Sequence, residues 1–269
     1  MHRAFSAAPK STFCTIEHYI RRQRRAPLNA FFSKRNVARR QNIVSTRANK
    51  LRLRIQEFSC NDTESGLGDA LAAAATDIAT EYIFRQSYDD IDRVDFNTGI
   101  TNMVRGHGDI ERRTKHIPFL GPIMIFSTGD SEQPLLGRLE RLPYLTALIK
   151  EGLRMSLRIA TRMTRIAAGR DITYGSWSIP AGTPVGMAGL LMHYDEQQYP
   201  NPTKFEPDRW LRSDSNKAGE KVFAPFSKET KMCVGMHLAW AELYIIIATL
   251  LVAFDIEFID AEAEDIKTN

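Results

Sequence analysis

Cysteine is scarce in this 269-residue chain, and so are long apolar runs. The three cysteines, Cys14, Cys60 and Cys233, are an odd number at wide spacings, and no CxxC pair occurs. This pattern argues against a disulfide framework and favours a reducing compartment. The longest apolar run, residues 243–254, is too short to span a bilayer and indicates a buried helix. The first residues also lack the apolar core of a signal peptide.

Acidic residues are nearly missing from the first 60 positions. This stretch has 14 Lys and Arg against Glu17 and Glu57, a net charge of +12, whereas the rest of the chain carries −8. Such a basic block fits nucleic acid, an anionic cofactor, an acidic partner or a solvated helix face. Stacking aromatics are few beyond Phe31 and Phe32, and no nucleic-acid-binding motif occurs. Nucleic acid is therefore the weaker interpretation.

The chain has no internal repeat, and its residue pattern predicts a mainly α protein with a small β part. Gly and Pro punctuate residues 97–137, which predicts an irregular connection. β-branched and aromatic residues broken by Gly and Pro predict short strands and hairpins in 159–189. Apolar periodicity predicts helices over four stretches: 17–58 with a break at Pro27, 69–87, 142–157 and about 233–254.

Three motifs in the second half carry chemistry. The first is an ExxR, Glu151 to Arg154, whose two side chains share one helix face. The second is FEPDRW at 205–210, and the third is FSKETKMCVG at 226–235, which leads Cys233 into the final apolar helix. The dipole and backbone N–H groups at a helix N-terminus favour a cysteine thiolate over the thiol. A thiolate is a soft anionic metal ligand.

In this order, the motifs resemble those of the cytochrome P450 haem-thiolate monooxygenases. The resemblance runs almost continuously from ERLPYLTALIKEGLR through PAGTPVGM and YPNPTKFEPDRW to the Cys233 loop. It is weaker in STFCTIEHYIRRQRRAPLNAFFSK, which resembles the family's basic helix. It implies one haem-thiolate-type domain over 1–269. That domain would contain a basic helix and following helices in 1–96, the connection in 97–137, and the ExxR helix, β region, cysteine loop and final helix in 138–269.

The resemblance also implies roles for individual residues. Cys233 would be the catalytic centre and the axial thiolate ligand of haem iron, and Phe226 would shield its sulfur. Glu151, Arg154 and Arg209 would form a buried ion network that fixes the loop around the cysteine, and such a network works only if every member is satisfied. The haem propionates would be held by three cations, namely Arg25, Arg162 and Lys231.

The chain departs from the family pattern in several places. Glu229 stands where a glycine is usual, Lys231 where an arginine is usual, and Arg21 where an aromatic residue or histidine is usual. The largest departure is an absence, because only about forty irregular residues lie where the long distal helix is expected. Thr76 and Asp77 look like part of that helix, but their neighbours place them on an earlier one. The resemblance therefore implies an incomplete fold that lacks the long distal helix, the first strands and the last hairpin.

Histidines offer little further chemistry. His237 lies four residues after Cys233, but one Cys and one His leave a zinc site short of ligands. His107, His116 and His193 have no partner at a useful spacing, so we expect them at surface or structural positions.

The implied function is a haem-dependent monooxygenase that oxidises a small apolar organic molecule, in the style of fungal secondary-metabolite biosynthesis. Its partner would be an NADPH-dependent reductase, whose acidic surface would suit the basic block. We expect no nucleic acid partner and no membrane anchor in this chain, which would be cytoplasmic or peripheral to the endoplasmic reticulum. Two alternatives stay open: a catalytically inactive truncated remnant with weak or no haem binding, and an anion- or nucleic-acid-binding module using residues 21–54.

Overall fold

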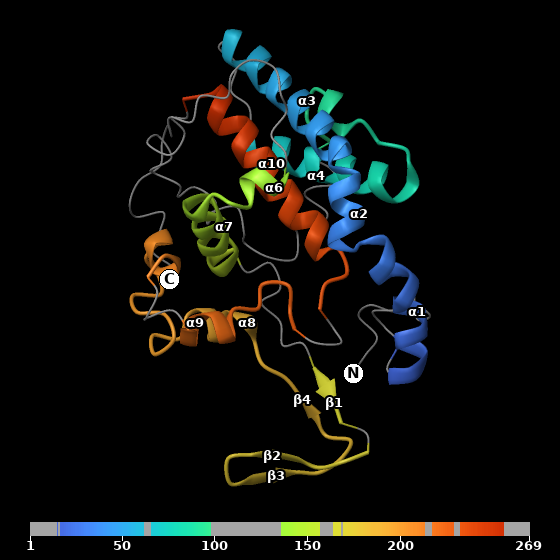
Figure 1. Ribbon diagram of the computed structural model, residues 1–269, viewed down its shortest axis with the longest axis vertical. Coiled ribbons are helices and arrows are strands. Elements are labelled where there is room, and N and C mark those ends of the chain that lie inside the picture. Colours follow the sequence, from blue (N-terminus) through green and yellow to red (C-terminus); the bar gives the residue numbers. More distant parts are fainter. Residues whose placement is uncertain are drawn as a thin grey trace. The chain divides into compact units, whose positions relative to one another are not determined.

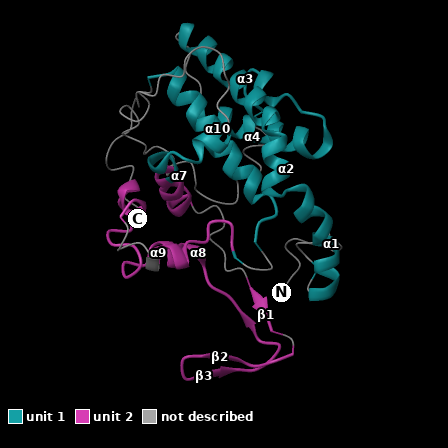
Figure 2. Cartoon of the chain, in the orientation of Figure 1, with its two compact units in different colours: residues 1–146, 228–269 teal, residues 147–227 magenta. Residues whose placement is uncertain are grey.

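The chain divides into two compact units in the computed structural model (Figure 2). Unit 1 comprises residues 1–146 and 228–269, and unit 2 comprises residues 147–227. Helices predominate in both, and the β structure of the described residues consists of two short antiparallel pairs (Figure 1). The prediction of a mainly α protein with a small β part is confirmed, whereas the single domain stays a prediction. The structure describes residues 15, 17–61, 66–97, 136–156, 164–167, 169–212, 217–228 and 232–255.

Unit 1 consists of helices packed around one apolar core. The core contains Val44, Leu51, Ile78 and Ile245, each 0% exposed. The last helix, α10, packs against α3, α2 and α6, so the C-terminal segment closes the core that the N-terminal helices begin (Figure 1). The elements are α1 (His18–Phe31), α2 (Lys34–Arg39), α3 (Gln41–Cys60), α4 (Leu67–Phe84), the 3-10 turn η1 (Asp90–Asp92), α6 (Leu136–Leu139) and α10 (Met236–Ala253).

Pro27 does not break the first helix, contrary to the prediction from sequence. Helix α1 continues through Pro27 to Phe31, and the chain breaks instead at Ser33. There the Ser33 hydroxyl accepts the backbone N–H of Asn36 at 3.4 Å and caps α2. Proline removes one backbone donor, but local capping and packing decide where the helix ends.

Thr76 and Asp77 serve the local structure of α4. The Asp77 carboxylate is fully buried and accepts the backbone N–H groups of Asp90 at 2.9 Å and Ile91 at 3.1 Å, which holds η1 against the helix. The Thr76 hydroxyl donates to the Ala72 carbonyl at 2.9 Å within the helix. Both residues therefore lie on an earlier helix, as their neighbours indicated.

Basic residues of α3 are paired with acids that follow them in the chain. Arg47 bonds Glu81 at 2.6 Å and Asp89 at 2.8 Å, and Lys50 bonds Asp92. The hydrogen bond from Arg47 is the main cause that lowers the pKa of Asp89. Part of the basic block is thus neutralised on this face, which weakens the alternative of a nucleic-acid-binding module.

Unit 2 joins part of α7 to short strands and turns. Helix α7 (Pro143–Met155) runs across the boundary between the units. Strand β1 pairs with β4, and β2 pairs with β3 through a turn in which Gly175 has φ +58°. These pairs confirm the short strands predicted in 159–189. The remaining elements are β1 (Arg165–Ile166), β2 (Ile172–Tyr174), β3 (Trp177–Ile179), β4 (Pro184–Val185), α8 (Gly189–His193), the 3-10 helix η4 (Pro207–Trp210) and α9 (Lys217–Val222).

By length and composition, α10 is apolar enough to cross a membrane. The expectation that no segment is long enough is therefore wrong, because the helix extends the apolar run toward its N-terminus through residues such as Leu238 and Trp240. Within unit 1, however, α10 packs against α3, and 44% of it is buried. That packing agrees with its interpretation as a buried helix.

Candidate functional site

The Glu151 carboxylate is the centre of a buried network in unit 2. Arg154, one helical turn later on α7, donates from Nε to Oε2 and from Nη2 to Oε1, both at 2.9 Å, which is a bidentate pair. Arg209 on η4 donates from Nε to Oε1 at 3.0 Å. Glu151 and Arg154 are 0% exposed and Arg209 is 6% exposed. The ExxR helix and the FEPDRW motif are therefore joined through one carboxylate.

Further partners complete the network. The indole Nε1 of Trp210 donates to Glu151 Oε2 at 2.8 Å. Arg154 Nη1 donates to the His193 carbonyl at 2.8 Å, and Arg209 Nη1 donates to the Pro200 carbonyl at 3.0 Å. The buried charges are thus each hydrogen-bonded, so removing one member would leave another uncompensated. Sequence reasoning missed Trp210, although an indole N–H inside FEPDRW is a donor that needs an acceptor when buried.

His193 is a second residue whose role the sequence did not reveal. It is 0% exposed at the end of α8, so it occupies a structural rather than a surface position. Its ring stacks on Phe223 with centroids 5.7 Å apart and meets Tyr199 edge-on at 6.2 Å. The residues that surround it come from distant parts of unit 2, which explains why no spacing in the sequence signalled it.

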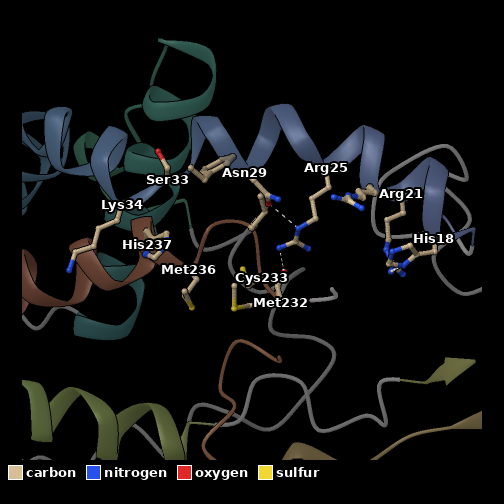
Figure 3. A pocket seen from close by; sticks show the side chains of 13 residues that line it. His18, Arg21, Arg25, Asn29, Ser33, Lys34, Met232, Cys233, Met236 and His237 are labelled. Carbon is tan, nitrogen blue, oxygen red and sulfur yellow. Dashed lines mark hydrogen bonds between the residues drawn. The ribbon is translucent and has the colours of Figure 1, made fainter. Parts of the chain in front are cut away.

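Cys233 lines a cavity of about 660 Å³ in unit 1 (Figure 3). Helix α1 forms another wall, to which Arg21, Arg22 and Arg25 contribute. No acidic residue lines this cavity among the described part of the chain, and Cys233 is exposed. The cavity therefore combines a thiol with several cations, which suits a ligand that carries negative charge.

Arg25 ties α1 to the residue before the cysteine. Its Nη2 donates to the carbonyl of Met232, and its Nε donates to Asn29 Oδ1 at 3.0 Å (Figure 3). Cys233 itself precedes Gly235, the N-cap of α10, by two residues. The helix thus begins just after the cysteine, close to where the sequence predicted it.

Three further residues were predicted to belong to the site, namely Phe226, Arg162 and Lys231. Phe226 is half-buried at the end of unit 2. Arg162 and Lys231, the other predicted propionate partners, lie outside the described residues. Arg21 is a cation that the prediction did not assign: it is 8% exposed, lines the cavity and donates from Nη2 to His18 Nδ1 at 3.2 Å.

A mainly α fold, a buried ExxR network and a cysteine beside a basic helix are together features of a class of haem proteins. A model of the family "Cytochrome P450" matches residues 124–269, more than half of the chain. The chain therefore belongs to the cytochrome P450 family, and the resemblance of its motifs is confirmed.

Curated relatives are fungal proteins of this family. Tryptophan 6-hydroxylase fscE of Fusarium equiseti is 44% identical over 138 residues, which are 51% of this chain and 27% of that protein. Cytochrome P450 monooxygenase sdnH of Sordaria araneosa is 44% identical over 126 residues, 47% of this chain and 23% of that protein. The chain thus spans about a quarter of the length of these two relatives.

A longer alignment places a gap inside the chain. N-acetyltryptophan 6-hydroxylase ivoC of Emericella nidulans is 27% identical over 369 positions, which cover 96% of this chain and 72% of that protein. The chain has only 269 residues, so at least 100 aligned positions of the relative have no counterpart here. The chain therefore covers only part of the P450 domain, in agreement with the incomplete fold that the sequence predicted.

Haem iron is the cofactor of this family, and the cavity in unit 1 has a composition that fits it. Haem brings two propionates and an iron that needs an axial ligand from the protein. The cavity has cations for the propionates, a thiol in Cys233, and apolar contacts from Phe32 and Met236. The described residues contain no group of three or more His, Cys, Asp or Glu that could hold a metal by themselves. A porphyrin supplies the remaining iron ligands, so this cavity suits haem better than a bare ion such as zinc.

Proposed function

We propose that this chain belongs to a haem-dependent monooxygenase that inserts one oxygen atom from O₂ into a small apolar organic molecule. A single observation carries the proposal, namely the cavity that places Cys233 with the arginines of α1, with no acidic side chain among the described residues that line it. Membership of the family supports it, because the family uses haem, a reductase partner and apolar substrates. Electrons would come from an NADPH-dependent reductase, and the setting would be fungal secondary metabolism, at the endoplasmic reticulum or in the cytoplasm.

In this proposal each site residue has a separate task. Cys233 ligates the iron, Phe226 shields the sulfur, and Arg25, Arg162 and Lys231 hold propionates. Arg25 also holds the cysteine loop against α1 through the Met232 carbonyl. When bound, haem supplies the activation of O₂, and the thiolate donates electron density that favours O–O cleavage. The ion network around Glu151 fixes the segments that precede the loop.

A second candidate is a remnant that binds haem weakly or does not turn over. The absence of at least 100 aligned positions favours this candidate, because a missing segment of that size removes surface that would cover the cofactor or substrate. The relatives' names mention tryptophan and N-acetyltryptophan as substrates of those proteins. For this chain we propose only the broader class of small apolar molecules.

Haem titration with cysteine variants tests the proposal. Cys233 and Cys60 are both exposed thiols, so Cys60→Ala is a matched control for Cys233→Ala. The reduced carbon monoxide complex should show the absorption band of thiolate-ligated haem in the wild type and in Cys60→Ala, and lose it in Cys233→Ala. Equal loss in both variants would refute the ligand assignment. Thiolate-ligated haem without product formation in the presence of a reductase would favour the remnant.

A further inference from the structure

The imidazole of His193 is held from both sides inside unit 2. The backbone N–H of Ala224 donates to Nε2 at 3.0 Å, and Nδ1 lies 3.2 Å from the carbonyl oxygen of Arg154. The carbonyl of His193 in turn accepts Arg154 Nη1 at 2.8 Å. The ring is 0% exposed. His193 therefore connects the ExxR helix directly to the segment around residue 224.

These partners determine which tautomer the ring adopts. A backbone N–H can only donate, so Nε2 must be the unprotonated acceptor. A carbonyl oxygen can only accept, so Nδ1 must carry the hydrogen and donate to Arg154. Both bonds require the same neutral form, with its proton on Nδ1. A protonated ring would point Nε2–H at the N–H of Ala224, and two donors would face each other.

The charged neighbours of the ring oppose its protonation as well. From α7, Arg154 lies beside it as a buried cation whose charge is shared with Glu151 through a bidentate pair. From the segment after α8, Tyr199 faces it edge-on, and burial raises the pKa of that phenol. From the segment after α9, Phe223 stacks on the ring. A second positive charge in this place would meet the Arg154 guanidinium in a water-poor environment.

We propose that His193 is a positioning residue, whose neutral ring locks the segment leading to the cysteine loop onto the ExxR helix. The bond to Ala224 is the essential one, because residue 224 begins the stretch that reaches Cys233 nine positions later. Protonation breaks this bond and releases the segment. The part of this inference that concerns the haem thiolate rests on the proposed function of Cys233, whereas the lock itself is a property of unit 2.

Three substitutions distinguish the effect of the hydrogen bond to Ala224 from the effect of the bond to Arg154. His193→Gln places an amide oxygen at the distance of Nε2, where it accepts from Ala224 without titrating. His193→Asn is shorter, so it reaches only the position of Nδ1 and donates to the Arg154 carbonyl. His193→Phe keeps the stacking on Phe223 and loses both bonds. If His193→Phe does not fold, the Gln and Asn variants still compare one bond with the other.

The first measurements use the full chain without haem. NMR of the imidazole nitrogens should show the Nδ1-protonated tautomer for His193. Amide hydrogen exchange at Ala224 should accelerate at least about 10-fold in His193→Asn and His193→Phe, and stay within about 3-fold of the wild type in His193→Gln, as expected for local opening. An Nε2-protonated tautomer, or equal exchange in all three variants, would overturn the proposal.

The second measurement uses the haem-loaded chain over a range of pH. Because the partners of the ring oppose its protonation, the wild type should lose the thiolate band only when the pH falls well below about 6.5, where an unperturbed histidine titrates. His193→Gln should keep the band about one pH unit lower. An identical pH profile in both proteins would refute the link from His193 to the cysteine loop. Failure of Cys233 as the ligand would appear separately, as a Cys233→Ala variant that retains the thiolate band while the exchange results stand.

Discussion

At the scale of single residues, the carboxylate of Glu151 holds several segments of unit 2 together. It accepts five N–H donors, two of them from Arg154 and the others from the Glu206 backbone, Arg209 and Trp210. Because this carboxylate is buried away from water, it depends on these donors in the folded state. Each donor therefore contributes to the stability of the unit, and the loss of one can be measured.

Trp210→Phe should lower the free energy of unfolding by about 1–2 kcal/mol, because it removes one hydrogen bond to a buried charged group and keeps the aromatic packing. Denaturant unfolding measures this change. Trp177→Phe is the matched control, since Trp177 is 73% exposed and should change stability by less than about 0.5 kcal/mol. Equal effects of the two substitutions would contradict the importance of the indole bond.

The carboxyl of Glu242 should make the stability of the chain depend on pH in an unusual direction. Burial raises the pKa of this α10 carboxyl from 4.5 to about 8. Between these values the folded chain holds a proton that the unfolded chain releases, so the free energy of unfolding should fall as the pH rises from about 4.5 to about 8. Glu242→Gln removes this contribution and should therefore be more stable than the wild type above pH 8.

Denaturant unfolding at several pH values tests this prediction. Glu196→Gln is the control, because Glu196 is exposed and the substitution makes the same chemical change. The control should leave the pH dependence as it is in the wild type. A Glu242→Gln curve parallel to that of the wild type would show that the carboxyl is not protonated in the folded chain.

At the scale of secondary-structure elements, two contacts hold segments in place. The Asp77 carboxylate anchors η1 to α4 by accepting two backbone N–H groups. The Arg25 guanidinium anchors the residue before Cys233 to α1. Each contact joins two separate segments of the chain. Its loss should therefore loosen a whole segment rather than a single side chain.

Asp77→Ala should destabilise the chain by about 2–3 kcal/mol, because two buried N–H groups lose their acceptor. Thr76→Ala should cost less than about 1 kcal/mol, since its hydroxyl bonds only within α4. Thermal or denaturant unfolding compares the two. Neither substitution should change the ratio of product to NADPH consumed in a haem-loaded, stable preparation. Their place in α4 argues against a catalytic role for Thr76 and Asp77. A selective loss of product in Thr76→Ala would contradict this and indicate such a role.

Arg25→Gln should weaken haem binding about 10-fold, because it removes both a cation from the cavity and the tether to the Met232 carbonyl. Haem titration measures the affinity, and limited proteolysis near residue 232 reports on the tether. Arg35→Gln makes the same change of charge at an exposed position of α2 and serves as the control. Equal losses in the two variants would indicate a general effect of charge rather than the cavity.

At the scale of the whole molecule, the absent positions matter most. The long relative has at least 100 aligned positions that this chain lacks, and Cys233 is exposed. A chemical step that needs proton delivery requires donors poised within hydrogen-bond reach, and it also requires the exclusion of bulk water. The described residues of the cavity supply cations and a thiol, but no acid.

The chain alone should therefore consume NADPH in a haem-dependent way with little hydroxylated product. The measurement supplies a reductase and records NADPH, hydrogen peroxide and product. A hybrid that carries the missing segment of a relative should raise the ratio of product to NADPH. Efficient coupling in the unmodified chain would contradict the importance of the absent segment and support the complete monooxygenase function.

The amino-acid sequence by itself determined the longer helices α3, α4, α7 and α10, the short β pairs and the family. These follow from local signals, namely apolar periodicity, Gly and Pro punctuation, and three motifs in a fixed order. Asp77 was also placed on the correct helix from its neighbours alone. For such features the contacts that matter lie within a few residues along the chain, so the pattern of the sequence carries them.

Only the tertiary structure decided the positions that depend on distant partners. It carried α1 past Pro27, paired Arg47 with Glu81, brought Trp210 to Glu151 and set His193 between Arg154 and Ala224. Each pairing joins residues that are tens of positions apart in the sequence. The physical reason is that burial removes water as a partner, so a polar group must bond whichever donor or acceptor the packing brings to it. Which group that is depends on how the elements pack, and no local pattern specifies it.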